Sequence, residues 1–154
     1  TRPEQRGLQY QLVQNALVFK PPMRLPGNIY LGGGAEHGEI DLKDALQSLV
    51  AFARVYAASH RVSRTHTLAR IEELADQGVL DRSARAEIGD AYDTLMRLRL
   101  ATQVADLRAG RTPTSRIELA DLSRTRQELM RQAFAQIAEL QKRADDDFPE
   151  AAGA

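Results

Sequence analysis

The chain has 154 residues, enough for one domain with its own core and too few for two domains of ordinary size. It contains no cysteine, which excludes disulfides, thiolate catalysis and cysteine metal ligands. Its 21 basic and 21 acidic residues balance, so no overall field draws it to nucleic acid or to an anionic membrane, and any phosphate site has to be local.

The first predicted element is an amphipathic helix from about Glu4 to Phe19, which ends before Pro21-Pro22. Helical spacing places its apolar residues on one face: Leu8, Leu12, Val13, Ala16 and Leu17.

A long loop follows, because residues 20–40 contain three prolines and five glycines, including Gly32-Gly33-Gly34. Short strand pieces are compatible with residues 17–20 and 28–31. A loop of this length in a small domain is usually functional.

The second predicted helix runs from Asp41, its cap, to His60, and the break comes at Ser63-Arg64. Its apolar face comprises Leu42, Leu46, Leu49, Ala53, Tyr56 and Ala57. The third helix starts near Thr65 or Thr67 and stops at Gly78, a residue suited to a left-handed helix end. We expect it to bury Leu68, Ile71, Leu74 and Ala75.

Asp81 is the predicted cap of a long fourth helix that reaches about Arg108 and is ended by Gly110 and Pro113. Ser123 caps a fifth helix up to about Arg143, and the acidic run 145–147 is expected to fray. The apolar positions of the fifth helix are Leu129, Met130, Ala133, Phe134, Ile137 and Leu140.

These elements predict an all-α fold, an antiparallel bundle of about five helices with a long Gly/Pro-rich loop after the first. The last four helices should pack together, with the first lying across them or beside a missing domain. We interpret residues 1–154 as a single domain with a core at about 16–143. Because the chain begins with Thr1 and not Met, we expect it to be a piece of a longer protein.

No apolar run is long enough to span a bilayer and no signal peptide is evident, so we expect a soluble, cytoplasmic protein with no membrane partner. Among the basic residues only Lys20, Lys43 and Lys142 are lysines, which indicates a strong bias toward arginine. That bias weakens any argument from the presence of an arginine alone.

Projection at 100 degrees per residue places Lys43, Gln47, Arg54 and Arg61 on one polar ridge beside the apolar face of the second helix. One interpretation is a solvated flank whose side chains cover apolar surface. The other is a ridge that faces phosphate, since cations offer charge-assisted hydrogen bonds to phosphate oxygens.

The same projection points Arg99 of the fourth helix toward the bundle, with Gln103 one turn further on. A buried guanidinium is costly unless it is paired. We therefore expect Arg99 to meet either a carboxylate, such as Asp106 or Asp41, or a ligand.

Other patterns are weaker. Gly32-Gly33-Gly34 lacks the Lys-Ser/Thr of a phosphate-binding loop, and the spacing of His37, His60 and His66 is not typical of metal ligands. Arg54 followed by His60 loosely resembles the Arg-x-His pair of small helical ribonucleases.

Five short motifs in order carry a family resemblance: Ile40-Asp41-Leu42-Lys43, Ala53-Arg54-Val55-Tyr56-Ala57, Thr67-Leu68-Ala69-Arg70-Ile71, Leu98-Arg99-Leu100 with Gln103, and Leu122-Ser123. Together they resemble the bacterial family of putative nucleotidyltransferase substrate-binding domains over about residues 16–143. In that family the domain is usually the C-terminal part of signalling proteins with CBS or cyclic-nucleotide-binding-like sensor domains.

The resemblance implies a helical domain that packs against a nucleotidyltransferase domain similar to those of protein-PII uridylyltransferases and glutamine synthetase adenylyltransferases. It implies that Asp41 and Lys43 face the nucleotide cleft. The other matching polar positions, and so the other implied nucleotide- or substrate-binding residues, are Arg54, Arg70, Arg99 and Gln103. Arg70 could also pair with Glu73 or Glu39.

The chain departs from the family pattern in two places. Thr114-Ser115 stands where the family often has an asparagine, and the Gly-Ser and Asp-x-Asp signature that holds magnesium is absent. We therefore expect Mg²⁺ and the catalytic groups to belong to a separate domain, with no cofactor, catalytic residue or metal ligand in this one.

The preferred hypothesis is a nucleotide-facing domain that contacts ATP or UTP and an adjacent nucleotidyltransferase domain, with a protein acceptor as a further candidate partner. The first alternative is a docking or homodimerisation module with an exposed apolar patch on its first helix. The second is a helical ribonuclease that uses Arg54 and His60.

Overall fold

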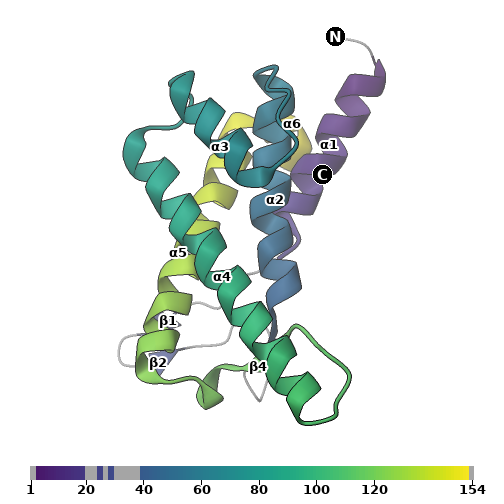
Figure 1. Ribbon diagram of the computed structural model, residues 1–154. Helices are drawn as coiled ribbons and strands as arrows, with labels where there is room; N and C mark the ends of the chain where they lie inside the picture. Colours follow the sequence, from purple (N-terminus) through teal and green to yellow (C-terminus); the bar gives the residue numbers. More distant parts are fainter. Residues whose placement is uncertain (1–2, 20–23, 26–27, 30–38, 153–154) are drawn as a thin grey trace.

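Helices dominate the part of the chain that the computed structural model describes, residues 3–19, 24–25, 28–29 and 39–152 (Figure 1). The helices are α1 (Pro3–Leu17), α2 (Leu42–Ser59), α3 (Thr67–Asp76), α4 (Arg82–Arg108), α5 (Arg124–Asp147) and the short α6 (Pro149–Ala152). Two antiparallel strand pairs accompany them: β1 (Arg24–Leu25) with β2 (Asn28–Ile29), and β3 (Glu39–Asp41) with β4 (Arg116–Glu118). The predicted all-α bundle is confirmed.

The helix ends follow the local signals in the sequence. The carboxylate of Asp41 accepts the amide of Lys43 at 2.9 Å, and that of Asp81 accepts the amide of Ala84 at 2.7 Å. Ser123 caps α5 in the same way. Gly78 and Gly110 follow α3 and α4 at φ values of 75° and 71°, which side chains disfavour. These predicted boundaries are confirmed.

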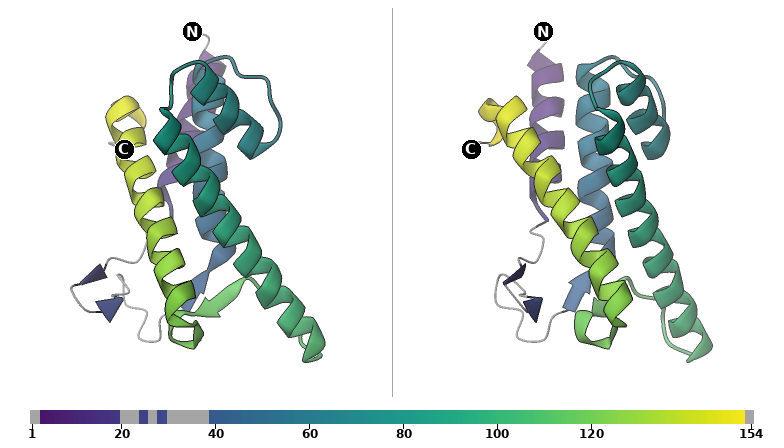
Figure 2. Two further views of the ribbon diagram at one scale, coloured as in Figure 1. Left: turned by 60° about the vertical axis from the view of Figure 1, so that its left-hand side comes forward. Right: turned by 90° about the vertical axis from the view of Figure 1, so that its left-hand side faces the viewer.

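Helix α2 lies at the centre of the bundle. It runs between α1 and α4 in Figure 1, with α5 behind, and it also touches α3. The chain descends along α1, ascends along α2, descends along α4 and ascends along α5, so each long helix is antiparallel to the one before it (Figures 1 and 2). Helix α1 packs along α2 and contacts α5 and α6. The prediction that it lies across the others was therefore wrong.

The core is built mainly from α2, whose predicted apolar face is fully buried. Three leucines predicted to be buried are exposed instead, namely Leu8 on α1, Leu68 on α3 and Leu129 on α5. The periodicity of the sequence places each leucine on the apolar face of its helix, but the neighbouring helices cover only part of that face. Val13, Ile71 and Met130 fill the core from the same three helices.

Helix α5 does not fray at residues 145–147, contrary to the prediction. The hydroxyl of Tyr56 donates to the carboxylate of Asp147, and the ring of Phe148 meets the ring of Tyr56 edge-on at 5.3 Å. Gln14 of α1 donates to the carbonyl of Ala151 in α6. Contacts from α1 and α2 therefore hold the acidic end of α5 in place.

The pair β3–β4 joins the start of α2 to the segment after α4. Asp41 is opposite Arg116 in its register, and the amide of Leu42 donates to the carbonyl of Ser115 at 2.8 Å. Strand β2 lies within the predicted piece 28–31, whereas Leu17 of the predicted piece 17–20 ends α1. Gly32-Gly33-Gly34 and His37 lie outside the described residues.

Within the described ranges, none of the helices combines the length and the apolar character that a membrane crossing needs.

Candidate functional site

A groove of about 330 Å³ is lined by residues of α1, α2 and α4. Residues of α2 form its centre, Leu12 and Asn15 form the α1 side, and Tyr92, Met96 and Arg99 form the α4 side. The α2 residues that line it are Lys43, Leu46, Gln47, Val50, Ala51 and Arg54. Three of the four residues of the predicted ridge, Lys43, Gln47 and Arg54, line this groove together, and Arg99 of α4 adds a third cation.

The groove is cationic. Among the described residues that line it, the charged ones are Lys43, Arg54 and Arg99, with no aspartate or glutamate. Lys43 and Arg54 are exposed, whereas Arg99 is half-buried, and Leu46 and Ala51 are buried beneath them. Three cations above an apolar floor fit an anion that also has an apolar part.

Asp41 has a structural role in this arrangement. Its carboxylate accepts the amide of Lys43 and so caps α2. The amide of Leu42, the first residue of α2, donates to the carbonyl of Ser115. These two first-turn amides are therefore engaged within the chain. The cationic groups that line the groove are therefore the side chains of Lys43, Arg54 and Arg99.

Arg99 has a different partner from the one predicted. Its Nε donates to the hydroxyl of Ser115 at 2.9 Å, and neither Asp106 nor Asp41 pairs with it. Ser115 is one of the two residues at which the chain departs from the family pattern. The contact between Ser115 and Arg99 could not be predicted from residue spacing in the sequence, because it depends on the path of the loop between them.

Asp106 organises that loop. Its carboxylate accepts hydrogen bonds from Arg111, at 2.9 Å to Nη2, and from the amide of Thr114 at 3.0 Å. The Thr114 amide, followed by the Arg111 guanidinium, lowers the pKa of Asp106 below its ordinary value. Both carboxylate oxygens are used in this way. Asp106 therefore positions the loop that delivers Ser115 to Arg99.

Of the other residues implied by the resemblance, Arg70 and Gln103 do not line the groove. Both carboxylates predicted as partners of Arg70 pair with other arginines, Glu73 with Arg64 at 2.9 Å and Glu39 with Arg116 at 3.1 Å. Gln103 lies half-buried on α4, one turn after Arg99. The structure brings together three of the six implied residues: Lys43, Arg54 and Arg99.

Two further sequence expectations are corrected here. Arg61, assigned to the ridge, lies beyond the end of α2 at φ 57° and does not line the groove. His60 terminates α2, with its Nδ1 2.9 Å from the carbonyl of Tyr56 and its ring stacked on Tyr56. Arg54 faces the groove and His60 does not, so the two residues of the ribonuclease alternative are not assembled into one site.

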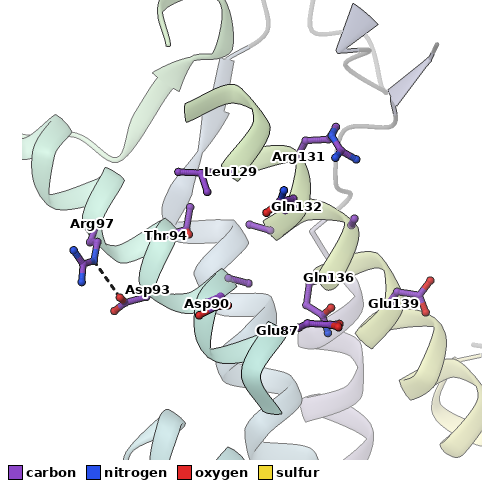
Figure 3. Close-up of a pocket in the computed structure, with 13 residues that line it drawn as sticks. Glu87, Asp90, Asp93, Thr94, Arg97, Leu129, Arg131, Gln132, Gln136 and Glu139 are labelled. Carbon is purple, nitrogen blue, oxygen red and sulfur yellow. Dashed lines mark hydrogen bonds and ion pairs between the residues drawn. The ribbon is translucent and has the colours of Figure 1, made fainter. Parts of the chain in front are cut away.

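A larger pocket of about 680 Å³ lies between α4 and α5 (Figure 3). Its carboxylates are Glu87, Asp90, Asp93 and Glu139, and the guanidinium of Arg97 pairs with Asp93 at 3.1 Å. Excess negative charge makes this pocket unsuitable for phosphate. A third pocket of about 560 Å³, between α1 and α6, has two carboxylates and one arginine. For an anionic ligand, the smaller cationic groove is therefore the better candidate.

The described residues of the groove do not fit a magnesium ion, because Mg²⁺ prefers carboxylate oxygens and none of these residues carries a carboxylate. Over the described stretches of the chain, no three His, Asp or Glu side chains lie close enough together to hold a metal. The groove residues fit phosphate oxygens directly.

The family model described as "putative nucleotidyltransferase substrate binding domain" matches residues 6–148, which include α1 from Arg6 onward and the whole of α5. No curated protein and no solved structure matches the chain.

Proposed function

Because the chain belongs to the family of putative nucleotidyltransferase substrate binding domains, we propose that its groove binds the polyphosphate of a nucleoside triphosphate. The observation that supports this proposal is the convergence of Lys43, Arg54 and Arg99 from two helices on a groove whose described lining has no carboxylate. Their side chains would supply charge-assisted hydrogen bonds to phosphate oxygens.

The distribution of the three cations suits an extended anion better than a single phosphate. Lys43 lies in the first turn of α2, and Arg54 lies eleven residues further on, about 16 Å along the helix axis at the usual rise. Arg99 faces them from α4. A chain of phosphates could engage cations at more than one of these points, whereas one phosphate could not span them.

The apolar groups in the groove suit the rest of a nucleotide. Tyr92 lies two turns and Met96 about one turn before Arg99 on α4, and both are half-buried. A half-buried aromatic ring beside a cationic groove offers a surface on which a base can stack. Asn15 and Gln47, which also line the groove, offer amide donors and acceptors to a ribose or a base.

The proposal places the metal chemistry elsewhere. In a protein similar to the uridylyltransferases, the groove would present the nucleotide to an adjacent nucleotidyltransferase domain in a signalling protein of the cytoplasm. This chain would bind and orient the polyphosphate, and the adjacent domain would supply Mg²⁺ and the catalytic carboxylates. Asp41 would act as the cap that fixes Lys43. Gln103 and Arg70 lie outside the groove and have no assigned role.

Isothermal titration calorimetry with ATP and with UTP tests the proposal. Lys43→Ala, Arg54→Ala and Arg99→Ala should each weaken binding about tenfold, because each removes a charge-assisted hydrogen bond. Lys142→Ala and Arg82→Ala are matched controls, since both residues are exposed and lie outside the groove. Unchanged affinity in all three groove variants, with the fold intact, would refute the assignment.

A further inference from the structure

Helix α4 has a second feature, on the side that faces away from the core. Leu100, Val104 and Leu107 follow one another at successive turns, with exposed fractions of 55%, 44% and 62%. We call these three residues the α4 stripe. The last turns of α4 project past the end of the bundle (Figure 2). Spacing of this kind is typical of a helix that packs against an apolar partner.

The α4 stripe is bordered by positive charge. Arg97 and Arg108 lie along one edge, and Arg111 follows the end of the helix. The carboxylate that neutralises Arg111 belongs to Asp106, which is only 8% exposed, whereas the side chain of Arg111 is 63% exposed. Arg97 is paired with Asp93 at 3.1 Å, and Asp106 is buried beneath Arg111, so the exposed positive charge around the stripe is mainly that of Arg108 and Arg111.

The charges disfavour a second copy of the chain as the partner. In an antiparallel two-fold pairing, the stripes of two copies bury each other. The two-fold axis then lies near Val104, and Arg97 of one copy lies opposite Arg111 of the other. A parallel two-fold pairing places Arg97 and Arg108 opposite their own equivalents. The parallel arrangement brings Arg108 against its own equivalent, which is unfavourable, and the antiparallel one offers Arg111 only Arg97, which is already paired with Asp93. Neither arrangement gives the arginines around the stripe a carboxylate partner.

We propose that the α4 stripe is a docking surface for an amphipathic helix of a partner protein, with an apolar face bordered by glutamate or aspartate. The apolar face would bury the three stripe residues, and the acidic border would meet Arg97, Arg108 and Arg111. The stripe adjoins the groove, because Met96 of the groove lies one turn before Leu100. A helix docked there would border the groove on its α4 side.

Designed peptides test this proposal without knowledge of the natural partner. A fluorescent helical peptide carries leucines at helical spacing between rows of glutamate, and a second peptide carries lysine in place of glutamate. We expect the glutamate peptide to bind the full chain in anisotropy titrations and the lysine peptide not to bind. Leu107→Ser should weaken glutamate-peptide binding about tenfold, and Arg108→Glu should weaken it as well.

Leu68→Ser is the matched control, since Leu68 is an exposed leucine on α3, far from the stripe in sequence. Thermal unfolding establishes that each variant is folded, and sedimentation measures association of the chain with itself. The proposal is overturned if neither peptide binds, if both bind equally well, or if Leu107→Ser behaves like Leu68→Ser. It is also overturned if the chain forms a dimer that Leu107→Ser dissociates.

Discussion

Arg99 and Ser115 are joined at 2.9 Å from the guanidinium Nε to the hydroxyl oxygen, across the end of the groove where α2 begins. The carbonyl of the same serine accepts the amide of Leu42, the first residue of α2. One loop residue thus fixes both an arginine of α4 and the start of the helix that carries Lys43. Nε is engaged within the chain, which leaves the two terminal nitrogens of Arg99 for a ligand.

Ser115→Ala tests whether this contact orients Arg99. The variant keeps the carbonyl that accepts Leu42 and removes only the hydroxyl, so the fold should persist with a loss of about 1 kcal/mol in the free energy of unfolding. If Arg99 binds phosphate, calorimetric affinity for ATP should fall about threefold to tenfold, because the guanidinium is no longer held. Thr112→Ala, in the same loop but exposed, is the control. Equal affinities in the two variants would mean that the contact is structural only.

Asp106→Asn should destabilise the fold in a pH-dependent way. The pKa of Asp106 is lowered from its ordinary value of 3.8, first by the Thr114 amide and then by Arg111. A lowered pKa in the folded state contributes stability that is present above pH 3.8 and lost as the pH falls through the folded value. At neutral pH the variant should therefore have a lower urea midpoint of unfolding than the wild type. The difference between the two midpoints should become smaller in acid.

Urea midpoints measured from neutral pH down to about pH 3 check the prediction. Asp90→Asn is the control, because Asp90 is an exposed carboxylate on the same helix. A gap between wild type and Asp106→Asn that stays constant across the range would show that the hydrogen-bond geometry matters and the charge does not.

Local signals in the sequence predicted most of the fold. Asp41, Asp81 and Ser123 each cap a helix through their own side chains, and Gly78 and Gly110 each take the backbone conformation that suits glycine. All five depend on residues within one turn of the helix end, so they can be read without knowledge of the tertiary structure.

The candidate site was only partly predictable for the opposite reason. Lys43, Gln47 and Arg54 share one helix, and projection alone places them on one face. Arg99 of α4 faces them because of the way the helices pack, which projection of one helix cannot show. Ser115 meets Arg99 because the hydrogen bonds of Asp106 fix the path of the loop. The predicted pairing of Arg99 with Asp106 failed because Arg111 and Thr114, closer in the loop, occupy both oxygens.

Tyr56→Phe should loosen the C-terminal end of the bundle. Burial, together with the hydrogen bond to Asp147, raises the pKa of Tyr56 well above its ordinary range. Phenylalanine keeps the ring contacts with Phe52 and Phe148 and loses only the hydroxyl, so we expect a loss of about 1 kcal/mol in the free energy of unfolding. The amides of Phe148 and Ala151 should exchange faster with deuterium, since α6 depends on this end of α5.

Alkaline pH provides a second measurement of the same contact. A raised pKa in the folded state gives stability that is fully present below pH 10 and is lost as the pH rises through the folded value. Wild-type stability should thus decline above pH 10 more steeply than that of Tyr56→Phe. Tyr10→Phe, which removes the hydroxyl of an exposed tyrosine on α1, is the control. Unchanged deuterium exchange at Phe148 in Tyr56→Phe would contradict the role assigned to the hydroxyl.

Ser48→Ala should leave the protein as stable as the wild type or make it slightly more stable. Ser48 is 3% exposed, and its hydroxyl oxygen has no hydrogen-bond partner among the described residues. Its surroundings are mostly apolar side chains of α1, α2 and α5, including Ala16, Leu49 and Ile137. Alanine removes an unsatisfied buried polar group at little cost in packing, so the expected change ranges from none to a gain of about 1 kcal/mol.

Ser59→Ala is the matched comparison, because the two serines lie on the same helix and differ in hydrogen bonding. The hydroxyl of Ser59 donates to the carbonyl of Val55 at 2.8 Å and accepts from Gln9 of α1 at 3.1 Å. Removal of the Ser59 hydroxyl should therefore lower the free energy of unfolding by about 0.5 to 1 kcal/mol. A lower urea midpoint would show this loss. If Ser48→Ala proves the more destabilising of the two, the Ser48 hydroxyl must have a hydrogen-bond partner in the folded protein, and the account of an unsatisfied buried group is wrong.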